Sequence, residues 1–139
     1  MRTAIFPARF DQLDEIRAFA AQAARDAGLQ DSEVHAVVLA VDEACSNIVE
    51  HAYRGKKKGE IECTCDADAE ALTIILRDHG RPFDLTRIPE PDLDTDLRHR
   101  QVGGLGIFIM KKLMDEVRFE VLGKSGNVLT LVKRKGETK

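Results

Sequence analysis

Two polar residues one helical turn apart, Glu43 and Asn47, form the first group in the chain that could do chemistry. The segment VDEACSNIVEHAYRG places polar residues on the helical face opposite its valines: Glu43, Asn47, Glu50 and Arg54. A carboxylate can take a proton from an attacking hydroxyl, and an amide oxygen can complete the shell of a Mg²⁺ otherwise held by phosphates and water. The alternative is an ordinary solvated helix face, on which Glu50 and Arg54 form an i,i+4 ion pair.

A second group, Asp78 and Gly80, stands at the end of a predicted buried strand. An ionised carboxylate accepts a hydrogen bond from a group such as the exocyclic amine of adenine. A glycine beside it lets the backbone approach a flat base closely, because it carries no Cβ. The alternative for this pair is a plain turn that follows a strand.

Three glycines, Gly103, Gly104 and Gly106, precede a predicted helix. Small residues at a helix N-terminus leave backbone N–H groups free for an anion such as phosphate. The spacing does not fit a dinucleotide-binding fold, which would need a third glycine where Ile109 stands. It does not fit a P-loop either, because no Gly-Lys-Ser/Thr stands at P-loop spacing after these glycines. A phosphate bound here would therefore be held by a different scheme.

The three groups occur in an order that resembles one known superfamily. VDEACSNIVEHAYRG, DHGRPFD and GGLGIFIMKKLMDEV resemble the N, G1 and G2 boxes of the GHKL, or Bergerat, ATP-binding superfamily. Within it the chain looks most like the small, single-domain serine kinases that act as anti-sigma factors in bacterial partner-switching pathways. The resemblance covers essentially the whole chain, and Pro82 in place of the second glycine of the G1 box favours that subfamily.

The resemblance implies a role for each matching residue. Asn47 matches the Mg²⁺ ligand, and Glu43 matches the carboxylate that serves as general base. Asp78 matches the adenine-binding acid, with Gly80 as its companion. Further positions match other contacts of the nucleotide: Gly103, Gly104 and Gly106 at the phosphates, Arg100 as a lid residue near the γ-phosphate, and Thr130 near the adenine and its bound water.

The elements that must position these residues can be read from periodicity and turn signals. The predicted order is β-α-α-β-β-loop-α-β-β. Its parts are a strand in 1–10, a helix from an N-cap at Asp11 to about Gly28, a helix from caps at Asp31 and Ser32 to near Arg54, the hairpin GEIECTCD to ALTIILRD, a long loop over 79–102, the helix in GGLGIFIMKKLMDEV, and the hairpin VRFEVLG to NVLTLVK.

Such an order predicts an α+β fold of two layers, with a mostly antiparallel sheet covered by helices on one face. A chain of 139 residues is one domain, and the resemblance implies that residues 1–139 form a single ATP-binding kinase domain. Long irregular connections in compact domains are usually lids or binding loops, and the resemblance implies that the proline-rich stretch over about 81–102 is the ATP lid.

Composition narrows the function classes. A net charge of -3 lacks the basic surplus of a nucleic-acid binder, and no segment has the composition of a membrane span. The first 15 residues lack a secretory signal pattern, so a cytoplasmic protein is expected. Cys45, Cys63 and Cys65 are predicted to be buried reduced thiols, because they form neither a disulfide framework nor a zinc-binding spacing.

The resemblance implies a cytoplasmic serine/threonine protein kinase that uses ATP and Mg²⁺. It implies a STAS-domain anti-anti-sigma protein as substrate, a sigma factor or another effector as the sequestered partner, and a homodimer. One alternative is a nucleotide-dependent sequestering module with little kinase activity. A second is a plain structural α+β domain without a nucleotide site.

Overall fold

A computed structural model describes residues 1–53, 59–82 and 104–136 of the chain. The main elements follow the predicted order: β1 (Arg2–Pro7), α1 (Leu13–Asp26), α2 (Asp31–Asn47), β2 (Glu60–Ala67), β3 (Ala71–Asp78), α3 (Gly104–Leu113), β4 (Glu116–Val121) and β5 (Asn127–Arg134). Short helical segments within these ranges are 3-10 turns at Phe10–Gln12 and Gly123–Ser125, and a π-helical segment at Ile48–Ala52.

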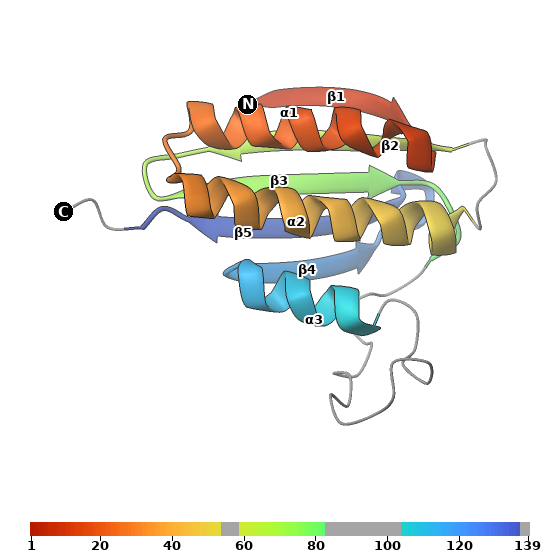
Figure 1. Ribbon diagram of the computed structural model, residues 1–139. Coiled ribbons are helices and arrows are strands. Elements are labelled where there is room, and N and C mark those ends of the chain that lie inside the picture. Colours follow the sequence, from red (N-terminus) through yellow and green to blue (C-terminus); the bar gives the residue numbers. More distant parts are fainter. Residues whose placement is uncertain (54–58, 83–103, 137–139) are drawn as a thin grey trace.

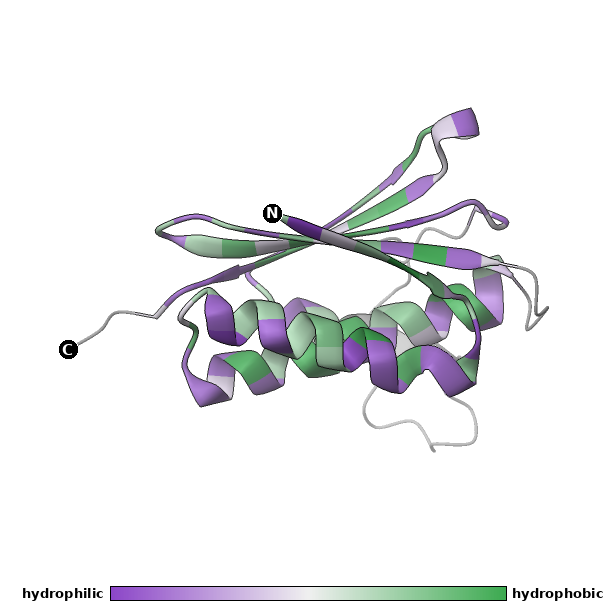
Figure 2. Ribbon diagram, turned by 90° about the horizontal axis from the view of Figure 1, so that it is seen from above, coloured by the Kyte–Doolittle hydropathy of each residue, from purple (hydrophilic) through white to green (hydrophobic). Residues whose placement is uncertain are grey.

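The five strands form one sheet in the order β1-β2-β3-β5-β4. Each neighbouring pair among them is antiparallel. The helices lie in a second layer against one face of this sheet, and the opposite face carries no helix among the described residues (Figures 1 and 2). The predicted two-layer α+β fold is confirmed.

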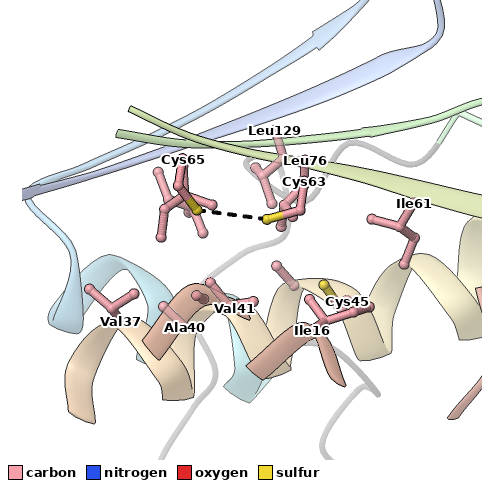
Figure 3. Close-up of a cluster of buried hydrophobic side chains, with 14 of the residues drawn as sticks. Ile16, Val37, Ala40, Val41, Cys45, Ile61, Cys63, Cys65, Leu76 and Leu129 are labelled. Atoms are coloured by element: carbon pink, nitrogen blue, oxygen red, sulfur yellow. Dashed lines mark hydrogen bonds between the residues drawn. The ribbon is translucent and has the colours of Figure 1, made fainter. Parts of the chain in front are cut away.

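The core lies between the two layers and follows from the period of each element. In β2 and β3 alternate side chains point to the helices, as Cys63 and Leu76 do opposite each other in register. Facing them is the apolar stripe of α2, which includes Val37 and Val41 (Figure 3). Burial between layers is the main source of stability in such a fold.

The three cysteines belong to this core, and all are buried and free, as predicted (Figure 3). The Sγ atoms of Cys63 and Cys65 are 4.0 Å apart, well beyond a disulfide bond. Burial raises the pKa of the Cys45 thiol far above its ordinary range, so this side chain packs as a neutral apolar group.

The predicted helix starts were wrong by one or two residues. Asp11 lies in the 3-10 turn before α1, which begins at Leu13. The N-cap of α2 is Gln30, not Asp31 or Ser32. Its backbone is extended, and its N–H donates to Glu33 Oε1 at 2.8 Å, as a glutamate three residues after a cap commonly accepts.

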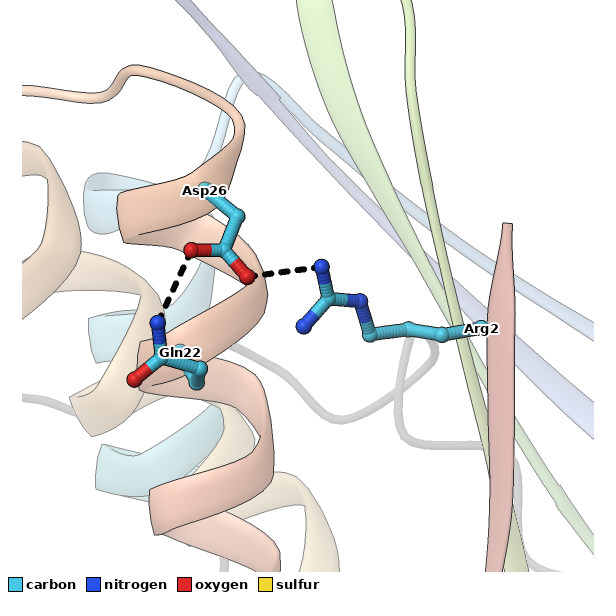
Figure 4. Close-up of polar contacts among 3 residues, drawn as sticks. All are labelled: Arg2, Gln22 and Asp26. Atoms are coloured by element: carbon cyan, nitrogen blue, oxygen red, sulfur yellow. Dashed lines mark hydrogen bonds and ion pairs between the residues drawn. The ribbon is translucent and has the colours of Figure 1, made fainter.

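The edge strand β1 is tied to α1 by a polar contact at the surface. Arg2 Nη2 donates to Asp26 Oδ2 at 2.7 Å, and Gln22 Nε2 donates to Asp26 Oδ1 at 2.8 Å (Figure 4). The Arg2 guanidinium is the largest cause that holds the pKa of the Asp26 carboxyl below its usual value. Because the pair is solvated, its main effect is to align β1 with the helix layer rather than to stabilise the fold strongly.

Candidate functional site

The helix that carries Glu43 and Asn47 changes its geometry directly after Asn47. It is α-helical from Asp31 to Asn47 and π-helical over Ile48–Ala52. A π-helical turn holds more residues, so the side chains after Asn47 are shifted around the axis, and such turns are frequent at functional sites. The predicted end near Arg54 is close to the observed one, although Arg54 itself lies outside the described residues.

Asn47 does not lie on a solvated face. Its exposed fraction is 4%, which excludes for this residue the alternative of an ordinary solvated helix face. Its Nδ2 donates to the backbone oxygen of Glu43 at 2.7 Å. That bond uses the amide nitrogen, and no hydrogen bond to Oδ1 is found in the part of the chain that the structure describes. A buried amide oxygen in this state is suited to a hard cation such as Mg²⁺.

Glu43 lies one turn before Asn47 and is half-buried. Burial raises the pKa of its carboxyl, and the neighbouring Asp42 carboxylate raises it further. Asp42 itself accepts a hydrogen bond from Arg17 Nη1 at 2.5 Å, so part of its charge is offset by α1. A carboxylate with a raised pKa is a better proton acceptor, which fits the predicted role as a base.

Asp78 is the last residue of β3 and is only 3% exposed. Its Oδ1 accepts hydrogen bonds from Gly80 N at 2.9 Å and from Asn127 Nδ2 at 3.0 Å. Burial raises the pKa of this carboxyl, while the bonds from Asn127 and Gly80 and the nearby His79 act in the opposite direction. Its Oδ2 has no hydrogen-bond partner within residues 1–53, 59–82 and 104–136, and is free to accept one from a ligand.

Gly80 is required by the packing of the protein itself, and not only by the approach of a base. A Cβ built on Gly80 would lie 2.6 Å from the carbonyl oxygen of Ala52, the last residue of the π-helical segment. The N–H of the next residue, Arg81, donates to that same oxygen at 2.7 Å. The turn after β3 is therefore packed directly on the end of the Asn47 helix.

Tyr53 fixes the same junction from the other side. Its hydroxyl accepts a hydrogen bond from His79 N at 2.9 Å and donates one to Glu60 O at 2.8 Å. One side chain thus joins the helix end to the start of β2 and to the turn beside Asp78. Sequence reasoning missed this role, since Tyr53 was read only as part of a motif.

A pocket opens where these segments meet. It holds about 280 Å³ of empty space, open solvent included. Its apolar lining residues are Ile48, Ala52, Phe119 and Leu129, and its polar lining residues are Asp78, Arg81 and Asn127. Such a lining suits a flat apolar ring that presents one polar edge to Asp78.

Thr130 is not part of this pocket. In β5 the core residues Leu129 and Leu131 face the helices, so Thr130 between them faces the other side of the sheet. Thr130, which the resemblance places near the adenine, thus lies on the opposite face of β5 from the pocket residue Leu129. The polar residue of β5 that does lie beside Asp78 is Asn127, directly opposite it in register. Strand alternation around the two leucines was the signal that could have excluded Thr130.

The glycine group is only partly described. Gly104 begins α3 and Gly106 lies in its first turn, where backbone N–H groups lack partners within the helix. Helix α3 packs against α2, which carries Glu43 and Asn47. Gly103, Arg100 and the predicted lid beyond Pro82 lie outside the described residues.

In the part of the chain that the structure describes, no helix combines the length and apolar character required to cross a bilayer.

Comparison with known proteins gives one consistent result. Residues 6–133 match the model of the histidine kinase-like ATPase domain. The chain is 32% identical over 135 residues to the serine-protein kinase RsbW of Bacillus licheniformis, covering 91% of this chain and 81% of that protein. It is 35% identical over 134 residues to the protein of the same name in Bacillus pumilus, with the same coverage.

A solved structure shows the same fold. It contains the RsbU and RsbW domains of a Mycobacterium tuberculosis protein, and the match has a TM-score of 0.63 at 18% identity. It covers 99% of this chain but only 34% of that longer one. The likeness therefore concerns one part of the longer protein.

Proposed function

The chain belongs to the histidine kinase-like ATPase family, and from that premise we propose that it is an ATP-dependent serine/threonine protein kinase. The single observation that carries the proposal is the pocket at the end of α2. There a buried carboxylate, Asp78, lies among apolar side chains and close to the helix of Asn47 and Glu43. The similarity to serine-protein kinases named RsbW supports the transfer of phosphate to a protein.

ATP would bind with its base in the pocket. Asp78 Oδ2 accepts the hydrogen bond of the exocyclic amine, and Phe119 and Leu129 offer apolar surface to the ring. The phosphates would extend toward Asn47 and the N-terminus of α3, where the first N–H groups have no partner within the helix itself. In this proposal segment 81–102 is a lid, Gly103 contacts phosphate, and Arg100 reaches the γ-phosphate.

Asn47 would hold the Mg²⁺ that accompanies ATP. Its Oδ1 is the neutral ligand, since its Nδ2 is already used by the Glu43 backbone oxygen. When bound, the cation supplies charge neutralisation on the phosphates, which is a large part of what phosphoryl transfer requires. The contribution of the chain is a buried ligand that the bond to α2 holds in one orientation.

Glu43 would act on the incoming hydroxyl group of the partner protein. It is half-buried, one turn from Asn47, and its pKa is raised. A carboxylate so placed would accept the proton that the serine or threonine hydroxyl loses as its oxygen bonds to the γ-phosphorus, while the bond from that phosphorus to the bridging oxygen breaks and ADP leaves. The same carboxylate orients that hydroxyl, and orientation is a major part of catalysis in this reaction class.

The partners in this proposal follow the family resemblance and the names of the relatives. The substrate is a STAS-domain anti-anti-sigma protein, and the protein sequestered when that antagonist is phosphorylated is a sigma factor or a similar effector. The kinase acts as a homodimer in the cytoplasm. The support is the similarity to RsbW proteins over 91% of the chain.

The test is a transfer assay with γ-labelled ATP and Mg²⁺. The purified protein is mixed with each STAS-domain protein of the same organism, and the label is traced to a residue. We expect label on one serine or threonine of one such partner. ATP binding without transfer to any of them would favour the sequestering module instead, and absence of ATP binding would contradict a nucleotide site altogether.

A further inference from the structure

Asn127 makes two hydrogen bonds that decide how the pocket presents Asp78. It is 4% exposed, and its Nδ2 donates to Asp78 Oδ1 at 3.0 Å and to Gly80 O at 3.0 Å. A carboxylate and a carbonyl only accept, so the atom that lies between them must be the amide nitrogen. The orientation of this side chain is therefore set by its partners.

The backbone holds Asn127 in this position. It stands directly opposite Asp78 in the β3–β5 register, just after the turn that joins β4 to β5. Gly126 before it has φ +93°, and a Cβ there would lie 2.5 Å from Asp78 O. Only a glycine lets the turn pass this close to the end of β3.

These bonds give the two oxygens of the Asp78 carboxylate different roles. Oδ1 receives both protein donors, Gly80 N and Asn127 Nδ2. Oδ2 is left as the acceptor that a ligand can meet. Asn127 Oδ1 also has no hydrogen-bond partner among the residues that the structure describes. The part of the pocket edge that Asp78 and Asn127 form thus consists of acceptors.

We propose that Asn127 is a positioning residue that keeps Asp78 fixed as a hydrogen-bond acceptor and so makes the pocket select a purine with a 6-amino group over a 6-oxo purine. The proposal rests on the proposed function, since it assumes that the pocket takes the base of ATP. An acceptor edge pairs with the amine of adenine, whereas it meets the oxygen of hypoxanthine with a second acceptor.

Loss of Asn127 would change what Asp78 offers. Burial raises the pKa of Asp78, and the bond from Asn127 is the largest influence that lowers it. The other titratable groups around it are His79 and Arg81 from its own turn and Tyr53 from the end of α2, while the pocket residues of β4 and β5 carry no charge. Without Asn127 the carboxyl protonates at higher pH, and a protonated carboxyl can donate to a 6-oxo group.

The experiment measures the affinities of ATP and ITP for the full chain by calorimetry between pH 6 and 8, with Mg²⁺ present. For the unaltered protein we expect a strong preference for ATP that changes little over this range. For Asn127→Leu, which is similar in size but has no donor, we expect ATP affinity to fall roughly tenfold or more. We also expect the ratio of ATP to ITP affinity to approach one, and the loss of ATP affinity to grow as the pH falls.

Asn127→Ser is the second variant, in case the apolar one does not fold. It keeps one donor, so its ATP/ITP ratio is expected to lie between those of the other two proteins. The matched control is Thr73→Val on β3, because Thr73 alternates with the core residues Leu72 and Ile74 and faces the side of the sheet away from the pocket. It should keep both affinities.

Two results would overturn the inference while leaving the proposed function standing. One is an ATP-binding Asn127 variant that keeps the full ATP/ITP ratio at every pH. The other is an unaltered protein that binds ATP and ITP equally well. An unaltered protein that binds no ATP would instead contradict the proposed function.

Discussion

Glu43 and Asn47 lie one turn apart, yet their environments suit them to different tasks. Asn47 is buried and its amide nitrogen is used by the helix itself, which leaves a neutral oxygen. Glu43 is half-buried and carries a carboxyl with a raised pKa. The first is suited to a cation and the second to a proton, so substitutions of the two should have separable effects.

Asn47→Ala should weaken binding of ATP with Mg²⁺ far more than binding of ATP without metal. The substitution removes an oxygen that only the cation needs. Loss of a residue that supports a metal site typically lowers metal affinity by roughly 10- to 100-fold. Calorimetry with Mg²⁺ and with EDTA measures both. Glu50→Ala, an exposed residue just after Asn47, is the control and should change neither. Equal losses with and without Mg²⁺ would remove Asn47 from the metal site.

Glu43→Gln should leave ATP affinity nearly unchanged while phosphorylation of the partner falls. It keeps the shape and removes the proton acceptor, and a positioned base contributes about 10²–10⁴-fold. Single-turnover transfer from labelled ATP measures the rate, with the exposed Glu50→Gln as matched control. Because a base works only when deprotonated and the pKa of Glu43 is raised, the rate of the unaltered enzyme should fall with acid at a higher pH than for an ordinary glutamate. A near-normal rate for Glu43→Gln would leave the reaction to positioning alone.

At the scale of elements, the site depends on how the turn after β3 packs on the end of α2. The π-helical segment ends at Ala52, whose carbonyl oxygen accepts the Arg81 N–H and lies against Gly80. The pocket thus depends on a contact between two segments that are distant in the sequence.

Gly80→Ala tests that contact. A Cβ would lie 2.6 Å from a backbone oxygen that cannot move without shifting the helix end. We expect a destabilisation of about 1–3 kcal/mol, the usual cost of overpacking, together with weaker ATP binding, since Gly80 N also donates to Asp78. Thermal denaturation and calorimetry measure the two effects. Unchanged stability would mean that the turn is not held in this position.

Thr130→Val tests the face assigned to β5. The side chain lies on the side of the sheet away from the pocket, so the ATP affinity of the variant should be unchanged within about twofold. The loss of a hydrogen bond worth about 1.5 kcal/mol would instead lower the affinity about tenfold. A titration of the variant beside the unaltered protein is sufficient. A large loss of affinity would place Thr130 at the nucleotide after all.

For the whole molecule, the buried Asp78 carboxylate of the site lowers the free energy of unfolding. Asp78 is a charge buried in the sheet layer, and burial raises the pKa of its carboxyl. A carboxyl whose pKa is raised in the folded state destabilises the fold as the pH rises from the ordinary value of 3.8 through the raised one.

Asp78→Asn should therefore raise the melting temperature at neutral pH and abolish ATP binding. The amide oxygen can still accept from Gly80 and Asn127, while the amide nitrogen replaces the free acceptor with a donor. Thermal denaturation from pH 4 to 8 measures the change. The gain should shrink as the pH falls, because the unaltered Asp78 then becomes neutral. A variant that is less stable at neutral pH would show that the ionised carboxylate stabilises the fold.

The order of the elements, the antiparallel hairpins and the two-layer architecture could be predicted from the sequence alone. Those depend on local signals: the period of two in GEIECTCD and ALTIILRD, the helical period around Val37 and Val41, and the glycines between strands. The sequence also singled out Glu43, Asn47 and Asp78, because their motifs are contiguous. The N-cap of α2 was predicted wrongly, because Asp31 and Ser32 are of the residue types that N-caps prefer, whereas Gln30 occupies the position.

The residues that complete the site could be identified only from the packing of the folded chain. The burial of Asn47 and the change from α- to π-helix directly after it have no signal in the local sequence. The choice of Asn127 over Thr130 depends on the β3–β5 register and on which face of β5 the helices cover. The role of Gly80 depends on Ala52, a residue from another element. Each of these features depends on packing between segments that are distant in the sequence, and local sequence patterns do not predict such packing.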